Sequence, residues 1–577
     1  MKASLPKSIW DHGFVPLSIL SLYCFSFFFL FTSRFPEDAR TVNTVFANRA
    51  GIISLFLAAA ALLIYLSVMK LSPGSGLSLI RKREKLLAAD FLLLLLPLAP
   101  VVQYVINNRD ILSTGAALQV ITTFLIFSLV VVIVLPAALS ILASRKTLMI
   151  TGMTFAFMVT NMAALSARFR WFQAGSLRIQ LIVLAAVFIA ARVLYRSAAG
   201  RKFLYSFVAI FFLSNTFIHL AAPGSTGVAP VGDDSENRLM EIAGTEIPLF
   251  TPNIYFLVYD AYVINETMLE YGLDNRDQEE YLESLGFTIY PHTYTVGEYT
   301  IPTISRTLEV SAEYYGSPRR GVSGDGVVQN LLKNFGYRTY GIFQSDRFFQ
   351  GIGSSYDFYF PAVNTRASVR LLIKAILMGE FRFDVAFDRP SREEFVESKM
   401  GVFRDISPQP RFVYMHDYLP GHSQISGRCL PDETDLFWER LIEANHQMRL
   451  DLEKILQGDP GAIIIVAGDH GPYLTKNCSA TGPDYHISEI SRLDIQDRFG
   501  AFLAIRWPEE NFSEYDDIVV LQDIFPAIFG YIFRDRGFLQ ARIEARTLAP
   551  DFISGAEVVD GIIRGGINDG EPLFLGP

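Results

Sequence analysis

Cysteine is scarce in this sequence of 577 residues, and only Cys429 and Cys478 lie after residue 222, so that part can hold at most one disulfide. The two could be bonded in an oxidising compartment, or both could be free thiols.

Basic residues are also in deficit after residue 222, since 30 Lys and Arg stand against 53 Asp and Glu, a net charge of −23. Nucleic-acid binding depends on neutralising phosphates, so this deficit argues against a nucleic-acid partner.

The first 222 residues have the opposite deficit, with 6 Asp and Glu against 20 Lys and Arg, a net charge of +14, and long apolar runs dominate them. Most of these runs approach the ~20 residues that cross ~30 Å of hydrocarbon. One such run could be a buried soluble helix, but their number predicts about seven membrane spans. The runs are residues 15–31, 51–69, 86–106, 118–142, 148–167, 179–194 and 203–222.

Lysine and arginine predict the orientation of these spans. The N-terminal tail and every second connection after it hold 12 of them, and the alternate connections hold seven. By the positive-inside rule, the N-terminus lies in the cytoplasm and the chain after the last span lies outside. No convincing small-residue cleavage site follows the first run, so we predict an uncleaved integral protein of the cytoplasmic (inner) membrane. Asp90, at the start of the third run, is expected to reach the membrane interface.

After residue 251 strands alternate with helices, which predicts a largely parallel sheet flanked by helices. The predicted organisation is a transmembrane helical domain at 1–222, a linker at 223–251 and an extracytoplasmic α/β domain at 252–577. Strands are expected at 253–259, 337–343, 412–415, 462–467 and 499–506, and helices at 327–335, 436–457 and 521–533.

Two of the predicted strands are followed by acids, and in α/β sheets chemistry gathers beyond the carboxyl ends of strands. NIYFLVY precedes Asp260, and IIIVAG precedes Asp469 and His470. Each motif alone could be an ordinary turn. If the two strands are neighbours, these three side chains could bind one divalent metal, Zn²⁺ or Mn²⁺ by ligand type, with Mg²⁺ possible.

Between these strands lies a stretch dense in hydroxyls, PHTYTVGEYTIPTISRTLEV. Pro302 is typical of the first position of a helix, which would place Thr300 near the N-cap, where backbone N–H groups favour an anion. A hydroxyl there that is bound to a divalent metal is a nucleophile suited to phosphoryl transfer. The alternative is that Thr300 only caps the helix.

Histidine is scarce as well, and six of the eight lie after residue 222. His416 and His422 follow a predicted strand, and His486 comes 16 residues after His470. Each could hold a phosphate or protonate a leaving oxygen, although a single histidine is more often structural.

These residues together resemble the alkaline phosphatase/sulfatase superfamily over roughly residues 252–535. The chain most resembles its membrane-anchored phosphoethanolamine and phosphoglycerol transferases, including lipoteichoic acid synthase. On this resemblance we assign metal binding to Asp260, Thr300, Asp469 and His470, catalysis to Thr300, His416 and His486, and substrate binding to His422, Thr295 and Arg306.

Departures from the family pattern bear on the chemistry. Ala261, and not a second acid, follows Asp260, so one metal is favoured over two. Thr300-Ile301-Pro302 lacks the Cys or Ser that sulfatases convert to formylglycine, so a formylglycine sulfatase is not expected. The transferases place their threonine at varying positions in this region, so Thr295 remains a rival nucleophile.

The function that the resemblance implies is metal-dependent transfer of phosphoethanolamine or phosphoglycerol from a membrane phospholipid to an envelope lipid or glycan, through a phospho-threonine. Two alternatives stay open. An extracytoplasmic hydrolase of phosphate or sulfate esters would use water as the acceptor. A catalytically silent envelope-assembly protein would keep the fold and lose the metal.

Overall fold

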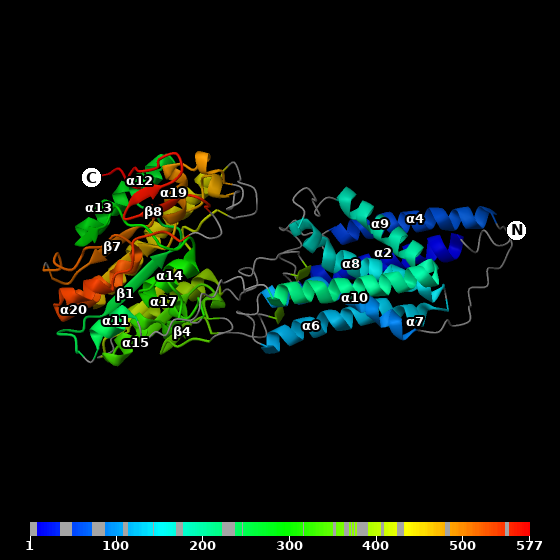
Figure 1. The fold of residues 1–577 in the computed structure, drawn as a ribbon, viewed down its shortest axis with the longest axis horizontal. Coiled ribbons are helices and arrows are strands. Elements are labelled where there is room, and N and C mark those ends of the chain that lie inside the picture. Colours follow the sequence, from blue (N-terminus) through cyan, green and yellow to red (C-terminus); the bar gives the residue numbers. More distant parts are fainter. Residues whose placement is uncertain are drawn as a thin grey trace. The chain divides into compact units, whose positions relative to one another are not determined.

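The computed structural model describes residues 9–34, 49–71, 87–107, 114–141, 143–168, 177–221, 237–244, 246–315, 317–349, 353–362, 369–370, 372–373, 376–377, 390–405, 409–423, 432–478, 485–509, 511–548 and 553–576. The chain forms two compact units (Figure 1). The first comprises Met1–Ser225 and Asn364–Asp388, and the second comprises Thr226–Val363 and Arg389–Pro577. The sequence predicts residues 364–388 in the second domain, whereas their contacts group them with the first unit.

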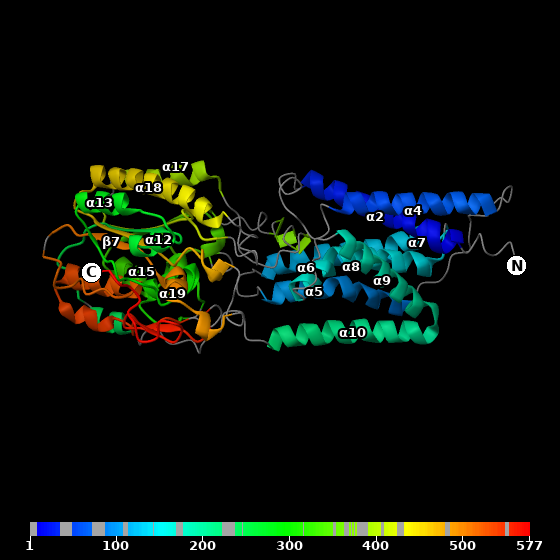
Figure 2. The same cartoon turned by 90° about the horizontal axis from the view of Figure 1, so that it is seen from above.

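The first unit is a bundle of helices, and each of the seven predicted runs contains helix in its described residues (Figures 1 and 2). Large side chains on the outside of the bundle are apolar, as lipid contact requires; Phe29 and Ile210 are 60% and 66% exposed. The helices are η1 (Trp10–Phe14), α2 (Val15–Arg34), α4 (Ala50–Leu71), η3 (Ala88–Leu94), α5 (Leu95–Asn107), α6 (Thr114–Leu129), η4 (Val130–Val134), α7 (Leu135–Leu139), α8 (Arg145–Arg168), α9 (Leu177–Arg196) and α10 (Ala198–Ala221).

Five helical segments in the described part of the chain are long and apolar enough to cross a membrane. The helices α8 and α10 are as long but fall outside that group. The five segments are Val15–Arg34, Ala50–Lys70, Ala88–Ile106, Thr114–Leu139 and Leu177–Arg196.

Asp90, which the sequence predicts to reach the membrane interface, has its side chain inside this bundle. Its side chain is 3% exposed and accepts hydrogen bonds from the Tyr195 hydroxyl and, at 2.5 Å, from the Tyr205 hydroxyl. The backbone N–H of Leu87 donates to its second oxygen at 2.9 Å. The carboxylate therefore has protein partners that compensate for its burial.

The second unit is built on a seven-stranded sheet with the order β2-β7-β6-β1-β5-β3-β4. Strand β7 pairs antiparallel with β6 and with β2, and the other strand pairs of the described sheet are parallel, so the predicted, mostly parallel sheet is confirmed. The predicted strand 499–506 is shorter than expected, because Phe499 ends a helix. The strands are β1 (Ile254–Tyr259), β2 (Phe287–Ile289), β3 (Arg338–Phe343), β4 (Phe358–Phe360), β5 (Arg411–Asp417), β6 (Ile463–Gly468) and β7 (Leu503–Arg506), with a separate hairpin of β8 (Glu557–Val559) and β9 (Ile562–Arg564).

Both faces of this sheet are covered by helices, which is why β1 and β6 are apolar without alternation. Tyr255 and Leu257 face a core that includes helices α17 (Arg392–Arg404) and α18 (Glu433–Gly458), which lie side by side in Figure 2. Ile254 and Phe256 face a second core with α15 and α20. The helices are α11 (Arg238–Ala243), α12 (Asn265–Glu270), α13 (Arg276–Ser284), α14 (Thr300–Glu309), η6 (Gly321–Asp325), α15 (Val327–Asn334), η7 (Asp346–Phe348), α17 (Arg392–Arg404), α18 (Glu433–Gly458), η9 (Lys476–Cys478), η11 (Ile487–Glu489), α19 (Arg492–Phe499), η12 (Leu521–Asp523), α20 (Ile524–Phe533) and η13 (Arg536–Ala541).

Candidate active site

The carboxyl ends of three neighbouring parallel strands meet at one edge of the sheet. Tyr259 of β1 lies opposite Asp417 of β5 and Gly468 of β6, so the residues that follow these strands share one place. That register brings the acid after β1 next to the acid and the histidine after β6. It is the arrangement that the sequence predicts, because both motifs close apolar strands.

The two glycines of the Gly468-Asp469-His470-Gly471 stretch are required by close backbone contacts. A Cβ at Gly468 would lie 1.8 Å from the Tyr262 carbonyl oxygen, and one at Gly471 would lie 2.0 Å from the Asp497 carbonyl oxygen. No side chain fits in either position. The two residues between them are thereby held against the chain that follows β1 and the end of α19.

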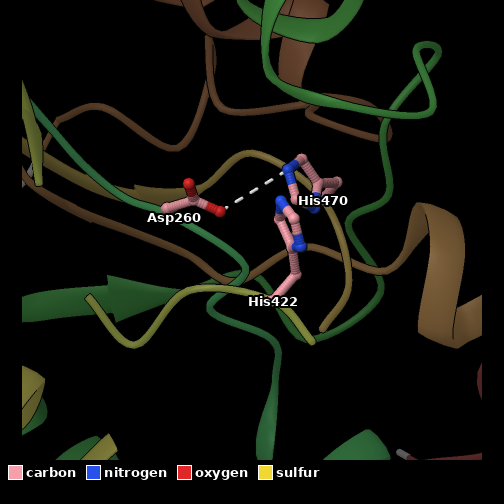
Figure 3. A group of neighbouring side chains, drawn as sticks. All are labelled: Asp260, His422 and His470. Atoms are coloured by element: carbon pink, nitrogen blue, oxygen red, sulfur yellow. Dashed lines mark ion pairs between the residues drawn. The ribbon is translucent and has the colours of Figure 1, made fainter. Parts of the chain in front are cut away.

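His470 is the centre of a buried cluster (Figure 3). Its Nε2 lies 3.6 Å from Oδ1 of Asp260 and 3.4 Å from Oδ2 of Asp469. The hydroxyl of Thr300 lies 3.4 Å from the same nitrogen. His422 adds a second imidazole, and one ligand atom each of Asp260, His422 and His470 lies within 4.8 Å of the others.

The histidine ring nitrogens are oriented by backbone carbonyl groups, which can only accept hydrogen bonds. Nδ1 of His470 donates to the Gly471 oxygen at 2.8 Å, and Nδ1 of His422 donates to the Ser423 oxygen at 2.6 Å. In the neutral ring this leaves the lone pair on Nε2. A metal-binding imidazole is typically held in this way, with its other nitrogen donating to a carbonyl.

The electrostatics of the cluster favour a cation. Burial lowers the pKa of His416 and of His422 to about 4 and that of His470 to about 3, so all three rings are neutral near pH 7. Burial, and then the charge of Asp469, raises the pKa of Asp260 well above its usual range. In the described part of the chain, Asp260 Oδ1, Asp469 Oδ2 and His416 Nε2 are buried without a hydrogen-bond partner. Carboxylates and neutral imidazoles whose buried atoms lack partners fit a divalent cation such as Zn²⁺ or Mn²⁺.

The structure brings Thr300 to this cluster and does not bring Thr295. Helix α14 begins at Thr300, with Tyr299 as its N-cap and Pro302 as its third residue, so the predicted helix start is wrong by about two residues and Thr300 is not a cap. The side chain of Thr295 is fully buried, and its hydroxyl donates to the Gly297 carbonyl oxygen at 2.5 Å.

The remaining candidates lie at different distances from the cluster. Nε2 of His416 is 3.9 Å from Oδ2 of Asp469, so this histidine joins it. His486 is exposed before η11, and no contact joins it to the cluster among the described residues. The Arg306 guanidinium donates to the carbonyl oxygens of Ala312 and Pro302 within its own helix and the turn after it. Cys478 is disulfide-bonded, and Cys429 lies outside the described residues.

Tyr473 is a site residue that the sequence did not predict. Its ring stacks on His470 with centroids 4.9 Å apart and planes 9° apart, and its hydroxyl donates to the Glu298 carbonyl oxygen at 2.7 Å. The Arg498 guanidinium lies 3.7 Å from the centre of the same ring. Tyr473 therefore joins the loop of His470 to the chain that enters Thr300. It lies within the GDHGPYL stretch, but its φ of +58° is not readable from that pattern.

A buried ionic network lies behind the cluster. Nζ of Lys399 is 3.2 Å from Oδ2 of Asp417 and 2.7 Å from Oδ2 of Asp451, and all three side chains are fully buried. Asp417 follows His416 directly, and its backbone oxygen accepts a hydrogen bond from the Asp260 N–H at 2.9 Å. The network thus fixes the ends of β1 and β5, which carry two residues of the cluster.

No protein-family model and no curated protein matches the sequence. Among solved structures, the chain is similar to the C-terminal periplasmic domain of EcEptC from Escherichia coli in complex with Zn, with 12% identity and a TM-score of 0.34 over 50% of this chain and 84% of that one. It is similar to the integral membrane protein lipooligosaccharide phosphoethanolamine transferase A (EptA) from Neisseria meningitidis, with 11% identity and a TM-score of 0.32 over 91% of this chain and 97% of that one. The lipoteichoic acid synthase LtaP from Listeria monocytogenes has 12% identity and a TM-score of 0.31 over 58% of this chain and 88% of its own. These likenesses are distant, so the function proposed below rests on the residues of this chain.

Proposed function

We propose that this chain is a metal-dependent phosphotransferase that moves phosphoethanolamine or phosphoglycerol from a membrane phospholipid to an envelope lipid or glycan. The observation that supports it most is the meeting of one hydroxyl, two carboxylates and neutral imidazoles in one buried cluster. The hydroxyl of Thr300 is 3.4 Å from Nε2 of His470, and oxygens of Asp260 and Asp469 lie 3.6 Å and 3.4 Å from the same nitrogen.

Asp260, Asp469, His470 and Thr300 would hold the metal, with His422 as a further ligand. A divalent cation bound there supplies Lewis-acid polarisation of a phosphoryl oxygen and lowers the pKa of a coordinated hydroxyl. The backbone N–H groups at the start of α14 favour a phosphate beside Thr300. Arg347 and Arg440 also favour an anion, since both act to lower the pKa of Asp260.

In the first step, Thr300 Oγ forms a bond to phosphorus, and the bond between phosphorus and the diacylglycerol oxygen breaks. The hydroxyl proton passes to a neutral imidazole, which then protonates the departing diacylglycerol oxygen. We assign this proton transfer to His416, because its Nε2 is buried, faces Asp469 at 3.9 Å and has no hydrogen-bond partner in the described residues. The exposed His486 is less suited to it.

In the second step, an acceptor hydroxyl loses its proton to the same imidazole and bonds to phosphorus. The phosphorus–Oγ bond of phospho-threonine breaks, and Thr300 regains a proton. Burial limits access of water, which would otherwise take the place of the acceptor; Thr300 and Asp260 are 7% and 8% exposed. The same residues with water as the acceptor would make a hydrolase of phosphate or sulfate esters.

The membrane unit fits a lipid donor, because it would keep the site close to the bilayer and raise the effective concentration of phospholipid. We propose that all seven predicted spans cross the cytoplasmic membrane, that the N-terminus is cytoplasmic, and that residues 252–577 form the extracytoplasmic catalytic domain. Five membrane-capable helices in the described residues support the membrane-embedded part of this proposal.

The test is release of diacylglycerol from phosphatidylethanolamine and phosphatidylglycerol by the full chain in detergent. Thr300→Ala should abolish release and keep most of the metal content, because the carboxylates and imidazoles of the cluster remain. Thr295→Ala should retain activity, because its hydroxyl faces the Gly297 carbonyl. Activity that survives in Thr300→Ala and is lost in Thr295→Ala would reassign the nucleophile. Turnover of simple aryl esters without any lipid donor would favour the hydrolase, and absence of both metal and turnover would favour the silent assembly protein.

A further inference from the structure

A polar cavity lies in the first unit, at the end of the bundle where α8 begins and α9 ends. Its volume is about 370 Å³, and the proposed chemistry uses none of its lining residues. Its wall includes Lys146 from the first turn of α8 and Arg192, Tyr195 and Arg196 from the last two turns of α9. Among the described residues that line it, none is acidic. We call it the basic cavity.

The three cationic side chains of the basic cavity have no carboxylate beside them. Arg192 and Arg196 are four residues apart, so their like charges are neighbours on one side of α9, which is unfavourable. Across the residues that the structure describes, no ion pair or side-chain hydrogen bond engages Lys146, Arg192 or Arg196. A cavity that gathers three positive charges in this way attracts an anion.

The wall that carries the two arginines is held by contacts behind it. The Tyr195 hydroxyl donates to the buried carboxylate of Asp90, and the Tyr205 hydroxyl donates to the same oxygen at 2.5 Å. Nη1 of Arg201 donates to the Tyr195 carbonyl oxygen at 3.2 Å. Asp90 thus lies behind Tyr195 and does not line the cavity. An anion would therefore meet cations on a fixed stretch of helix, which lowers the entropic cost of binding.

An apolar strip on the surface of α9 leads to the basic cavity. It consists of Ile182, Ile189 and Val193, and the last two are 59% and 65% exposed. Their spacings of seven and four residues place them on one face of the helix, and Arg196 follows on that face three residues later. A ligand that has both a phosphate and acyl chains can lay its chains along this strip and reach the cavity with its phosphate.

We propose that the basic cavity binds the phosphate of an anionic membrane phospholipid through Lys146, Arg192 and Arg196, with the acyl chains along the apolar strip of α9. A guanidinium binds phosphate in a bidentate manner and lysine binds it as a point charge. Basic pockets between membrane helices bind anionic headgroups through the same interactions. Free phosphate would use the three cations but not the strip.

This lipid is distinct from the donor of the proposed reaction. The residues of the basic cavity all belong to the first unit, whereas Thr300 and its cluster belong to the second. On the orientation proposed above, the start of α8 and the end of α9 face the cytoplasmic leaflet, and the catalytic domain lies on the other side of the membrane. Binding at the cavity does not depend on the transferase chemistry.

The experiment is a titration of the full chain with phosphatidylglycerol in dodecyl maltoside, in which native mass spectrometry counts the bound lipid. A chelator is present, so that no lipid is turned over. Diacylglycerol with the same acyl chains but no phosphate is titrated in parallel, and inorganic phosphate is added as a competitor. We expect phosphatidylglycerol to bind at least about tenfold more tightly than diacylglycerol, because its phosphate makes charged hydrogen bonds. Millimolar inorganic phosphate should not displace it.

Matched variants locate the bound lipid. Arg192→Gln combined with Arg196→Gln should weaken phosphatidylglycerol binding at least about tenfold. Lys70→Gln combined with Lys202→Gln removes the same charge from exposed positions on α4 and α10 that do not line the cavity, and should bind like the unchanged protein. Arg192→Lys combined with Arg196→Lys keeps the charge and loses the bidentate geometry, so its affinity should be intermediate. Melting temperatures without lipid, within a few degrees of the unchanged protein, show that the variants fold.

An equal loss of affinity in the two charge-removing pairs would overturn the proposal, because the lipid would then respond only to the general positive charge of the bundle. Unchanged affinity in both pairs would overturn it as well, since the cavity would not be where the lipid binds. Equal binding of phosphatidylglycerol and diacylglycerol would exclude a phosphate contact. Displacement of phosphatidylglycerol by inorganic phosphate would exclude the lipid as the preferred ligand and assign the cavity to free phosphate.

Discussion

A methyl group added at Gly468 tests how the fold holds the cluster. An ideal Cβ there would lie 1.8 Å from the Tyr262 carbonyl oxygen, and real Cβ atoms do not approach closer than 3.0 Å, so the backbones must separate by at least about 1.2 Å. The oxygen cannot simply turn away, because the Phe502 N–H donates to it at 3.0 Å. Asp469 and His470 come directly after Gly468 in the chain, so they must move with this end of the strand. Overpacking of this kind costs about 1–3 kcal/mol, and a misplacement of ~1 Å costs about 10²-fold in rate.

Gly468→Ala should therefore lower the free energy of unfolding by about 1–3 kcal/mol and reduce zinc affinity and transfer by about 10²-fold. Gly461→Ala is the matched control, since a Cβ at Gly461, in the turn before β6, meets nothing within 4 Å. Thermal melting and calorimetric zinc titration of the two variants make the comparison. If Gly468→Ala binds zinc and turns over lipid as well as Gly461→Ala, the close approach to Tyr262 is not what positions the cluster, and the reasoning is refuted.

Three further predictions concern buried charge. Lys399→Met should cost about 3–5 kcal/mol of unfolding free energy, because the buried Asp451 loses its lysine and Asp417 keeps only the pair with Arg392. Lys476→Met, in an exposed ion pair, should cost under about 1 kcal/mol in the same melting assay. Burial raises the pKa of Asp523 to about 6. In the folded protein this carboxyl group is therefore protonated below about pH 6 and ionised above it. Asp523→Asn should then stabilise by about 3 kcal/mol near pH 7.5 and by almost nothing near pH 4, and an equal gain at both would contradict the assignment. Zinc at 100 times its Kd should stabilise the unchanged protein by about 2.7 kcal/mol, and Asp260→Asn should abolish the corresponding rise in melting temperature.

The sheet was predictable because its central strands are apolar on both faces. The six-residue strands β1 and β6 lack any helical or alternating pattern, and each is followed by its acid at the predicted place. The three-residue strands β2 and β4 were missed, since three residues are too few to show a period. The packing of Leu372 and Ile376 in the core of the first unit was not predictable, because a long-range contact leaves no local mark in the sequence.

Of the candidate site, the residues next to strand ends followed from the strand pattern, Thr300 and His422 were expected from the family resemblance, and Tyr473 was not predicted. Asp260, Asp469 and His470 occupy fixed places after apolar runs, so the sheet determines where they lie. We prefer Thr300 to Thr295 because the Thr295 hydroxyl donates a hydrogen bond to the Gly297 carbonyl oxygen. The spacing of the two threonines in the sequence does not predict that hydrogen bond. The stacking of Tyr473 on His470 likewise depends on a left-handed backbone at that residue.

The measurement that tests the central claim most directly is the intact mass of the purified full chain after incubation with phosphatidylethanolamine and phosphatidylglycerol, with and without a chelator, followed by peptide mapping. The proposed mechanism predicts a metal-dependent adduct on Thr300, whose mass identifies phosphoethanolamine or phosphoglycerol, and none in Thr300→Ala. Bound metal with diacylglycerol release but no adduct on any threonine would contradict the covalent mechanism. A protein that binds no metal and forms no adduct would contradict the catalytic assignment altogether.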